Sequence, residues 1–178
     1  EVKDYPFKFI SNGLFGYIAH EAIEYFENIK LDETKGSHEI PDLYYAIYQN
    51  VIAISLFNHE AHIFSHTYNT SHNIGMISQL LQNNHLSTFK FKKVGNKNSN
   101  LTDNQFINFV IKAKEHCQRG DVFQLVLSRS FSQKFHGDEF NVYRSLRSIH
   151  PSPYLFFFDY GNFKIFGSSP DAHLIIDT

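Results

Sequence analysis

Hydrophobic and polar residues alternate over several short stretches of the chain, which is typical of β-strands with one buried face. Residues 43–57 and 61–68 are rich in Tyr, Ile, Val and Phe on either side of a polar turn, and they predict a β-hairpin. Residues 154–158 and 163–166 predict a second hairpin. We also expect extended segments within residues 5–18.

Four other stretches carry apolar residues at helical spacing, which predicts amphipathic helices. These are residues 21–28, 74–83, 103–119 and 138–149. The third has the clearest ends, because Thr102 and Gln105 have the spacing of a capping box and Gly120 can end the helix. Pro151 should stop the fourth. Helices and hairpins together predict an α+β fold of largely antiparallel sheets with packed helices.

Residues 119–131 predict a central strand that follows the third helix. One face of this strand would be apolar, with Phe123, Leu125, Leu127 and Phe131 in the core. The opposite face mixes polar and apolar side chains, with Gln124 near its middle. Periodicity alone favours a solvated Gln124, because glutamine is mostly exposed in folded proteins.

Composition narrows the class of protein. The 178 residues include 16 Lys and Arg against 18 Asp and Glu, a formal net charge of -2. This balance provides no positive field, so we expect neither a nucleic-acid nor a membrane partner. The sequence contains neither a run of apolar residues long enough to cross a bilayer nor a secretory leader at its start, which predicts a soluble, cytoplasmic protein. The single cysteine, Cys117, is expected to be a buried thiol and not a nucleophile.

Candidate chemical motifs are few. Gly13 and Gly16 lack the Lys-Ser/Thr of a P-loop and the third glycine of a dinucleotide fingerprint, so backbone geometry explains them better. His59, His62 and His66 resemble a ligand cluster, but on a strand His59 would face away from the other two. We therefore expect no metal site, and the chain shows no paired carboxylates or Ser-His-Asp arrangement.

A basic, asparagine-rich stretch at residues 90–100 predicts a solvated connector and marks the best candidate for a domain boundary. This divides the chain into residues 1–100 and 101–178. The sequence starts at Glu1 without a methionine and stops at Thr178 just after a strand-like run. We expect an excised or incomplete chain.

Three motifs resemble the large subunit (component I) of anthranilate synthase, in order and in spacing. They are Gly-Asp-Val-Phe-Gln-Leu-Val-Leu-Ser-Arg at 120–129, Pro-Ser-Pro-Tyr-Leu-Phe at 151–156 and Gly-Ser-Ser-Pro at 167–170. Residues 12–17 and the region 42–54 are also similar to that family. The likeness covers nearly the whole chain and implies a partial anthranilate-synthase-like fold.

The resemblance implies conversion of chorismate and ammonia to anthranilate and pyruvate with Mg²⁺. Residues 1–100 would belong to the N-terminal, regulatory-side domain, and residues 101–178 would begin the chorismate-binding catalytic domain. In the family the magnesium-binding glutamates, the catalytic histidine and the substrate-binding arginine lie further towards the C-terminus, so this chain alone should be inactive and hold no metal.

The one active-site position implied for this chain is Gln124. In related isochorismate and salicylate synthases the position resembles a lysine that activates water, whereas an amide can orient ammonia but cannot act as a base. Gln124 therefore favours amination. Component I of 4-amino-4-deoxychorismate synthase also carries glutamine there, and Val126-Leu127-Ser128-Arg129 favours the anthranilate branch.

Feedback control by tryptophan is the second implied function. The family's pocket segment corresponds to Pro153, Tyr154, Leu155 and Phe156, with Leu155 in place of the usual methionine. The pocket's other wall, a Leu-Leu-Glu-Ser segment, is missing here, and Asp171 and His20 replace the usual Glu and Tyr. A glutamine amidotransferase subunit is the implied protein partner. The alternative from another class is a non-catalytic module for tryptophan sensing or subunit docking.

Overall fold

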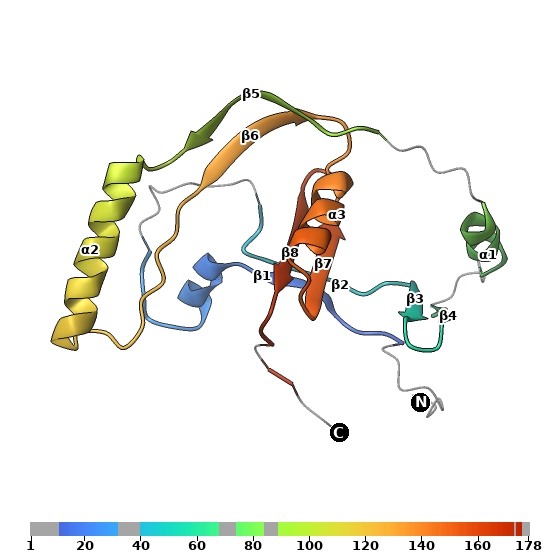
Figure 1. The fold of residues 1–178 in the computed structure, drawn as a ribbon. Coiled ribbons are helices and arrows are strands. Elements are labelled where there is room, and N and C mark those ends of the chain that lie inside the picture. The colour runs from blue at the N-terminus through green and yellow to red at the C-terminus, as the bar shows by residue number, and fades with distance from the viewer. Residues whose placement is uncertain (1–10, 32–39, 68–73, 84–88, 173, 176–178) are drawn as a thin grey trace. The chain divides into compact units, whose positions relative to one another are not determined.

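The computed structural model describes residues 11–31, 40–67, 74–83, 89–172 and 174–175 (Figure 1). These residues form short strands and helices. The strands are β1 (Phe15–Ile18), β2 (Leu43–Ala46), β3 (Asn50–Ser55), β4 (Glu60–Ser65), β5 (Lys92–Ser99), β6 (Phe131–His136), β7 (Tyr154–Asp159) and β8 (Lys164–Ser169). The helices are a 3₁₀ helix at His20–Tyr25, α1 (Ile74–Gln82), α2 (Asp103–Arg119) and α3 (Phe140–Ile149). This mixture confirms the predicted α+β class with antiparallel pairing.

The chain divides into two compact units. The first contains residues 1–86 together with the tip of the β7–β8 hairpin, residues 158–165. The second contains residues 87–157 and 166–178. The sequence-based division after residue 100 concerned functional domains and stays a prediction.

Two antiparallel pairs build the first unit, β1 with β2 and β3 with β4. The predicted hairpin over residues 43–57 and 61–68 is therefore wrong in its first part, because β2 pairs with β1 and only β3 pairs with β4. Gly16 explains the close approach of β1 to β2, since a Cβ there would lie 1.9 Å from the carbonyl oxygen of Tyr44. The predicted helix at residues 21–28 is a 3₁₀ helix. The strands predicted before residue 11 lie outside the described residues.

The second unit is built on α2, α3 and the antiparallel pair β5–β6. The predicted capping box is confirmed: Thr102 Oγ1 accepts from the Gln105 backbone at 3.3 Å, and Gln105 Oε1 accepts from the Thr102 backbone at 2.9 Å. Gly120 ends the helix in the left-handed conformation, with φ of 78°.

The predicted connector at residues 90–100 is wrong in part, because it contains strand β5. All eight residues of β5 are exposed and only Val94 is a sizeable apolar residue, so the stretch carries no alternating hydrophobic pattern. Its strand conformation comes from backbone pairing with β6, which a local pattern does not encode.

The predicted central strand is also wrong over most of its length. Residues 122–130 adopt no strand in the structure, and β6 starts at Phe131. The reason is that no described strand pairs with these residues, because the β5–β6 ladder ends where Ser99 pairs with Phe131. A strand needs a partner to satisfy its backbone groups. Phe123 is consequently fully exposed instead of lying in the core, and Leu125 is 41% exposed.

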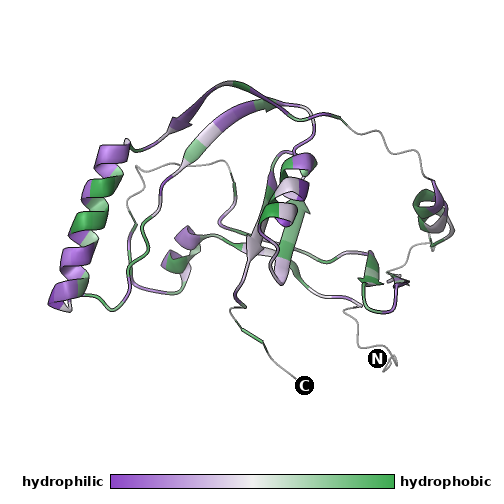
Figure 2. Cartoon of the chain, viewed as in Figure 1, coloured by the Kyte–Doolittle hydropathy of each residue, from purple (hydrophilic) through white to green (hydrophobic). Residues whose placement is uncertain are grey.

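Apolar side chains are exposed throughout the described part of the chain. Ala22 is the only hydrophobic residue there that is fully buried. Figure 2 shows apolar residues on both α2 and α3. Cys117 on α2 is exposed, so the prediction of a buried thiol is wrong. The physical reason is that only Leu125 and Leu127 face this side of α2, and they leave Cys117 in an open groove.

Candidate functional site

Gln124 lies in segment 122–130, which has no regular secondary structure and connects the end of α2 to the start of β6. Its side chain is exposed, and none of the described residues forms a hydrogen bond with it. The amide is therefore available to a ligand or to further polypeptide. Its assignment as an active-site residue stays a prediction.

The same segment has one strongly held side chain, Arg129. Its Nε donates to Ser99 Oγ at 2.9 Å, and its Nη2 donates to the carbonyl oxygen of Leu101 at 2.7 Å. Its Nη1 pairs with Asp103 Oδ1 at 2.7 Å. The Arg129 side chain is only 18% exposed. Sequence reasoning used Arg129 only as a family marker and missed this network. The available signal was an arginine at the end of the predicted strand together with an acidic residue, Asp103, in the first turn of α2.

The other end of the segment is held by a charged cluster at the end of α2. The Asp121 carboxylate lies 2.8 Å from His116 Nδ1 and 2.9 Å from Arg119 Nη2. The Asp121 backbone also donates to the His116 carbonyl oxygen at 3.0 Å. Basic side chains in the last turn of a helix interact favourably with its dipole, so this arrangement also stabilises the end of α2.

Between these two ends, an apolar groove of about 420 Å³ lies where α2 meets segment 122–130. Leu125 and Leu127 line it from the segment. Its lining from α2 consists of Val110, Ala113, Lys114, Cys117 and Gln118. The predicted inward face of the strand is thus directed towards α2 at these two leucines, although it is not closed into a core.

The second and third motifs contact each other directly. Ser152 Oγ and Ser168 Oγ are 2.7 Å apart, and Ser168 Oγ donates to the His150 carbonyl oxygen at 2.8 Å. A Cβ on Gly167 would lie 2.6 Å from Cζ of Phe156, so only glycine allows the Phe156 ring to lie against this strand. The serines and the glycine thereby hold the end of α3 and the β7–β8 hairpin together.

The predicted tryptophan segment lies at the start of β7. Pro153 and Tyr154 are exposed, and Leu155 and Phe156 are half-buried. The next residue, Phe157, packs against α3, with ring centroids 4.9 Å from Phe140 and 5.4 Å from Tyr143. A tryptophan pocket at residues 153–156 stays a prediction.

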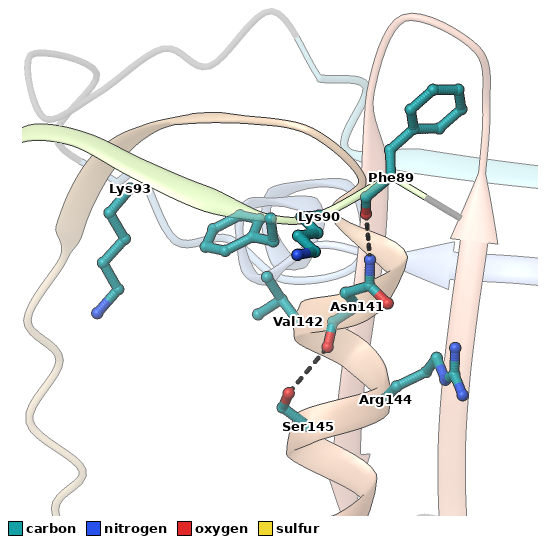
Figure 3. A pocket seen from close by; sticks show the side chains of 8 residues that line it. Phe89, Lys90, Lys93, Asn141, Val142, Arg144 and Ser145 are labelled. Carbon is teal, nitrogen blue, oxygen red and sulfur yellow. Dashed lines mark hydrogen bonds between the residues drawn. The ribbon is translucent and has the colours of Figure 1, made fainter. Parts of the chain in front are cut away.

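A second groove, of about 700 Å³, is formed by the start of β5 and one side of α3 (Figure 3). Its lining contains the cationic residues Lys90, Lys93 and Arg144 and no acidic residue. The Asn141 side-chain amide donates to the Phe89 carbonyl oxygen at 2.7 Å and joins the two walls. Lys93 and Arg144 point away from each other in Figure 3, so their charges do not converge on one point. None of the predicted site residues lies in this groove.

Tyrosines gather in the first unit. The Tyr160 ring lies 4.5 Å from that of Tyr44 and 5.7 Å from that of Tyr17, measured between centroids. Burial raises the pKa of Tyr17 and of Tyr160 above the ordinary value of 10.0. The hydrogen bond that Tyr25 donates to Asp42 Oδ2, at 3.0 Å, raises the pKa of Tyr25. These hydroxyls are therefore neutral at physiological pH. Tyr17 donates to the Pro41 carbonyl oxygen at 2.8 Å, whereas the buried Tyr160 hydroxyl has no hydrogen-bond partner among the described residues.

Across the part of the chain that the structure describes, no three His, Cys, Asp or Glu side chains gather into a metal-binding group. The expected strand placement of the three histidines is wrong, because His59 lies in the β3–β4 turn with φ of 57° and only His62 lies on β4. No helix among the described residues has both the length and the apolar character needed to cross a membrane.

Comparison with known proteins extends this description. Residues 2–177 match the chorismate binding enzyme family. The chain is 34% identical to anthranilate synthase component 1 of Lactococcus lactis over 182 residues, which cover 94% of this chain and 38% of the relative. It is 31% identical to the protein of the same name from Methanothermobacter marburgensis over 160 residues, covering 89% of this chain and 32% of the relative.

A solved structure is also similar. Anthranilate synthase component I from Streptococcus pneumoniae matches with a TM-score of 0.71 and 26% identity, over 96% of this chain and 40% of that chain. The fold that the resemblance implied is confirmed by this match. The chain spans two fifths or less of the length of these three relatives.

Proposed function

This chain belongs to the chorismate binding enzyme family, and from that premise we propose that it serves anthranilate synthesis, the conversion of chorismate and ammonia to anthranilate and pyruvate. The observation that carries the proposal is the structural match to the Streptococcus pneumoniae component I over 96% of the chain. Relatives that share the name anthranilate synthase component 1 support it and do not favour the aminodeoxychorismate alternative. The proposed class is a lyase, and a cytoplasmic location is part of the proposal.

The described residues contain no complete catalytic set, so we propose that activity requires polypeptide equivalent to the remainder of the longer relatives. The residues described do not fit Mg²⁺, because no three carboxylate, histidine or cysteine side chains come together in them. A hard cation needs several oxygen ligands. In this proposal the metal is held outside this chain, and the chain alone is inactive.

Gln124 is the side chain of this chain that we propose to touch a reactant. Its amide oxygen can accept a hydrogen bond from ammonia and turn the nitrogen lone pair towards the ring carbon that is attacked. An amide has no basic group near neutral pH, so Gln124 orients the nucleophile and does not deprotonate it. Such orientation raises the rate of amination because it holds ammonia in a near-attack geometry relative to the ring carbon.

A chimaera tests this function. The matched segment of the Lactococcus lactis relative is replaced by this chain, and anthranilate fluorescence is followed with chorismate, ammonia and Mg²⁺. We expect turnover in the chimaera, none in the 178-residue chain, and a loss of roughly 100-fold in kcat/KM for ammonia on Gln124→Ala, the scale of a misplaced reactant. Formation of aminodeoxychorismate or isochorismate in place of anthranilate would refute the assignment.

Tryptophan inhibition and association with a glutamine amidotransferase subunit complete the proposal. Half-buried Leu155 and Phe156 beside exposed Tyr154 provide an apolar surface that an indole can contact. Calorimetry of the chimaera with tryptophan should give heat that Tyr154→Ala abolishes; absence of heat in both proteins would remove tryptophan sensing. Copurification of the chimaera with the Lactococcus lactis amidotransferase subunit tests the partner, and failure to associate would contradict it.

A further inference from the structure

Segment 122–130 has enough residues to run the length of helix α2. α2 contains 17 residues, which at a rise of about 1.5 Å per residue corresponds to about 25 Å. Residues 122–130 follow it without regular secondary structure, and nine residues can span at most about 30 Å at about 3.3 Å each. The segment is thus long enough to return along the whole helix, and Leu125 and Leu127 line a groove with α2 on the way.

The far end of this segment meets the N-terminus of α2 through Arg129. The guanidinium group uses three separate nitrogens to reach Ser99, the Leu101 carbonyl and Asp103. Asp103 is the first residue of α2, and its carboxylate is 85% exposed, so the charge pair by itself contributes little. The bond to the Leu101 carbonyl is part-buried and fixes the guanidinium against the residue that precedes the N-cap.

Two aromatic rings complete the surroundings of Arg129. Its guanidinium carbon lies 4.7 Å from the ring centroid of Phe131 in β6 and 5.9 Å from that of Phe106 in α2. Arginine stacks on aromatic faces and donates in a fixed fork, which lysine does not reproduce. The neighbouring backbone is also paired, since Ser130 donates to Asn100 Oδ1 at 3.0 Å.

We propose that Arg129 is a positioning residue that holds segment 122–130, and with it Gln124, along α2. The role in placing Gln124 rests on the proposed function; the holding of the segment does not. Between Asp121 at one end and Arg129 at the other, the described residues make no backbone hydrogen bond that would fix residues 122–128. The side-chain anchors therefore decide the path of the segment.

Backbone ¹⁵N relaxation on the 178-residue chain tests the holding role. We expect order parameters near 0.85 for residues 122–130 in the unsubstituted chain and below 0.6 in Arg129→Ala, the ranges of rigid and flexible backbone. Arg129→Lys should give intermediate values, because it keeps the charge and loses the fork. Arg147→Ala is the matched control, since Arg147 is exposed on α3 and should leave the segment unchanged.

Unchanged order parameters in Arg129→Ala, with α2 still folded, would overturn the proposal. If Arg129→Ala unfolds α2 as well, Arg129→Lys decides: local loss confined to residues 122–130 supports the proposal, and no change overturns it. A general loss of order across α2 and α3 in Arg129→Lys would indicate a merely structural role and also overturn it.

The chimaera tests the consequence for Gln124. We expect Arg129→Lys to lower kcat/KM for ammonia by about 10-fold while KM for chorismate stays within twofold. A freed segment with an unchanged rate would overturn the role of Gln124 and leave the holding role of Arg129 supported. Failure of the proposed function is distinguishable, because it removes turnover from the chimaera and leaves the relaxation result on the chain intact.

Discussion

Gly167→Ala tests whether the contact between the second and third motifs is as tight as the structure indicates. A Cβ at this position would lie 2.6 Å from Cζ, 2.9 Å from Cε1 and 3.4 Å from Cε2 of the Phe156 ring. Carbon atoms pack at about 3.5–4.0 Å, so two of these contacts overlap by several tenths of an ångström to about 1 Å. The Phe156 ring must move by a similar distance.

This movement is costly because Phe156 is half-buried in β7 and cannot swing freely into solvent. Inserting a methyl group into packed surroundings typically costs about 1–3 kcal/mol. Urea unfolding has a slope of roughly 2 kcal/mol per molar for a domain of this size, so the midpoint should fall by about 0.5–1.5 M. Alanine has no backbone difficulty at this position, since Gly167 does not have a positive φ.

Urea unfolding followed by far-UV circular dichroism measures the shift. Phe156→Leu in the Gly167→Ala background should recover part of the loss, because the smaller side chain leaves room for the methyl group. Gly75→Ala is the matched control: a Cβ there meets nothing within 4 Å, and alanine in α1 should stabilise by up to about 1 kcal/mol. An unchanged midpoint in Gly167→Ala would refute the contact.

Two further predictions concern α2 and the tyrosines. Thr102→Ala removes the capping-box acceptor and should lower the free energy of unfolding by about 1 kcal/mol. Thr102→Ser keeps the hydroxyl and should lose much less. Equal losses in the two variants, measured by urea unfolding, would contradict the role of the capping box. Asp42→Ala should lower the raised pKa of Tyr25 towards 10.0 and leave that of Tyr160 unchanged, as followed by NMR titration. Because the pKa values of these tyrosines are raised in the folded state, their contribution to stability is complete below pH 10 and is lost as the pH rises through the folded-state values. The urea midpoint should therefore fall above pH 10, and a constant midpoint there would contradict the raised pKa values.

Local signals in the sequence predicted the helices well. The capping box at Thr102 and Gln105, the left-handed Gly120 and the apolar stripe of residues 74–83 all act within a few residues of the chain. The β7–β8 hairpin was also predicted, because its turn residues and its flanking apolar runs are adjacent. Each of these features depends on backbone preferences and short-range hydrogen bonds, which the sequence carries directly.

Strand pairing was predicted less well. β2 pairs with β1 and not within the hairpin that follows it, and β5 forms opposite β6 without an apolar pattern of its own. The sequence pattern around Gln124 predicts a strand, yet no strand among the described residues pairs with this segment. Pairing partners are distant in sequence, so a local pattern shows that a segment can be a strand but not what it pairs with.

The candidate site follows the same division. Residue identities and motif order in the sequence were sufficient to indicate the family and to single out Gln124. Only the tertiary structure brought Arg129 to Phe106 and Ser152 to Ser168, because these contacts join residues 16 or more positions apart through folded elements. The sequence therefore determined which side chains are present and how the chain turns locally. The tertiary structure decided which side chains contact one another, because those contacts depend on the packing of elements that are remote from one another in the chain.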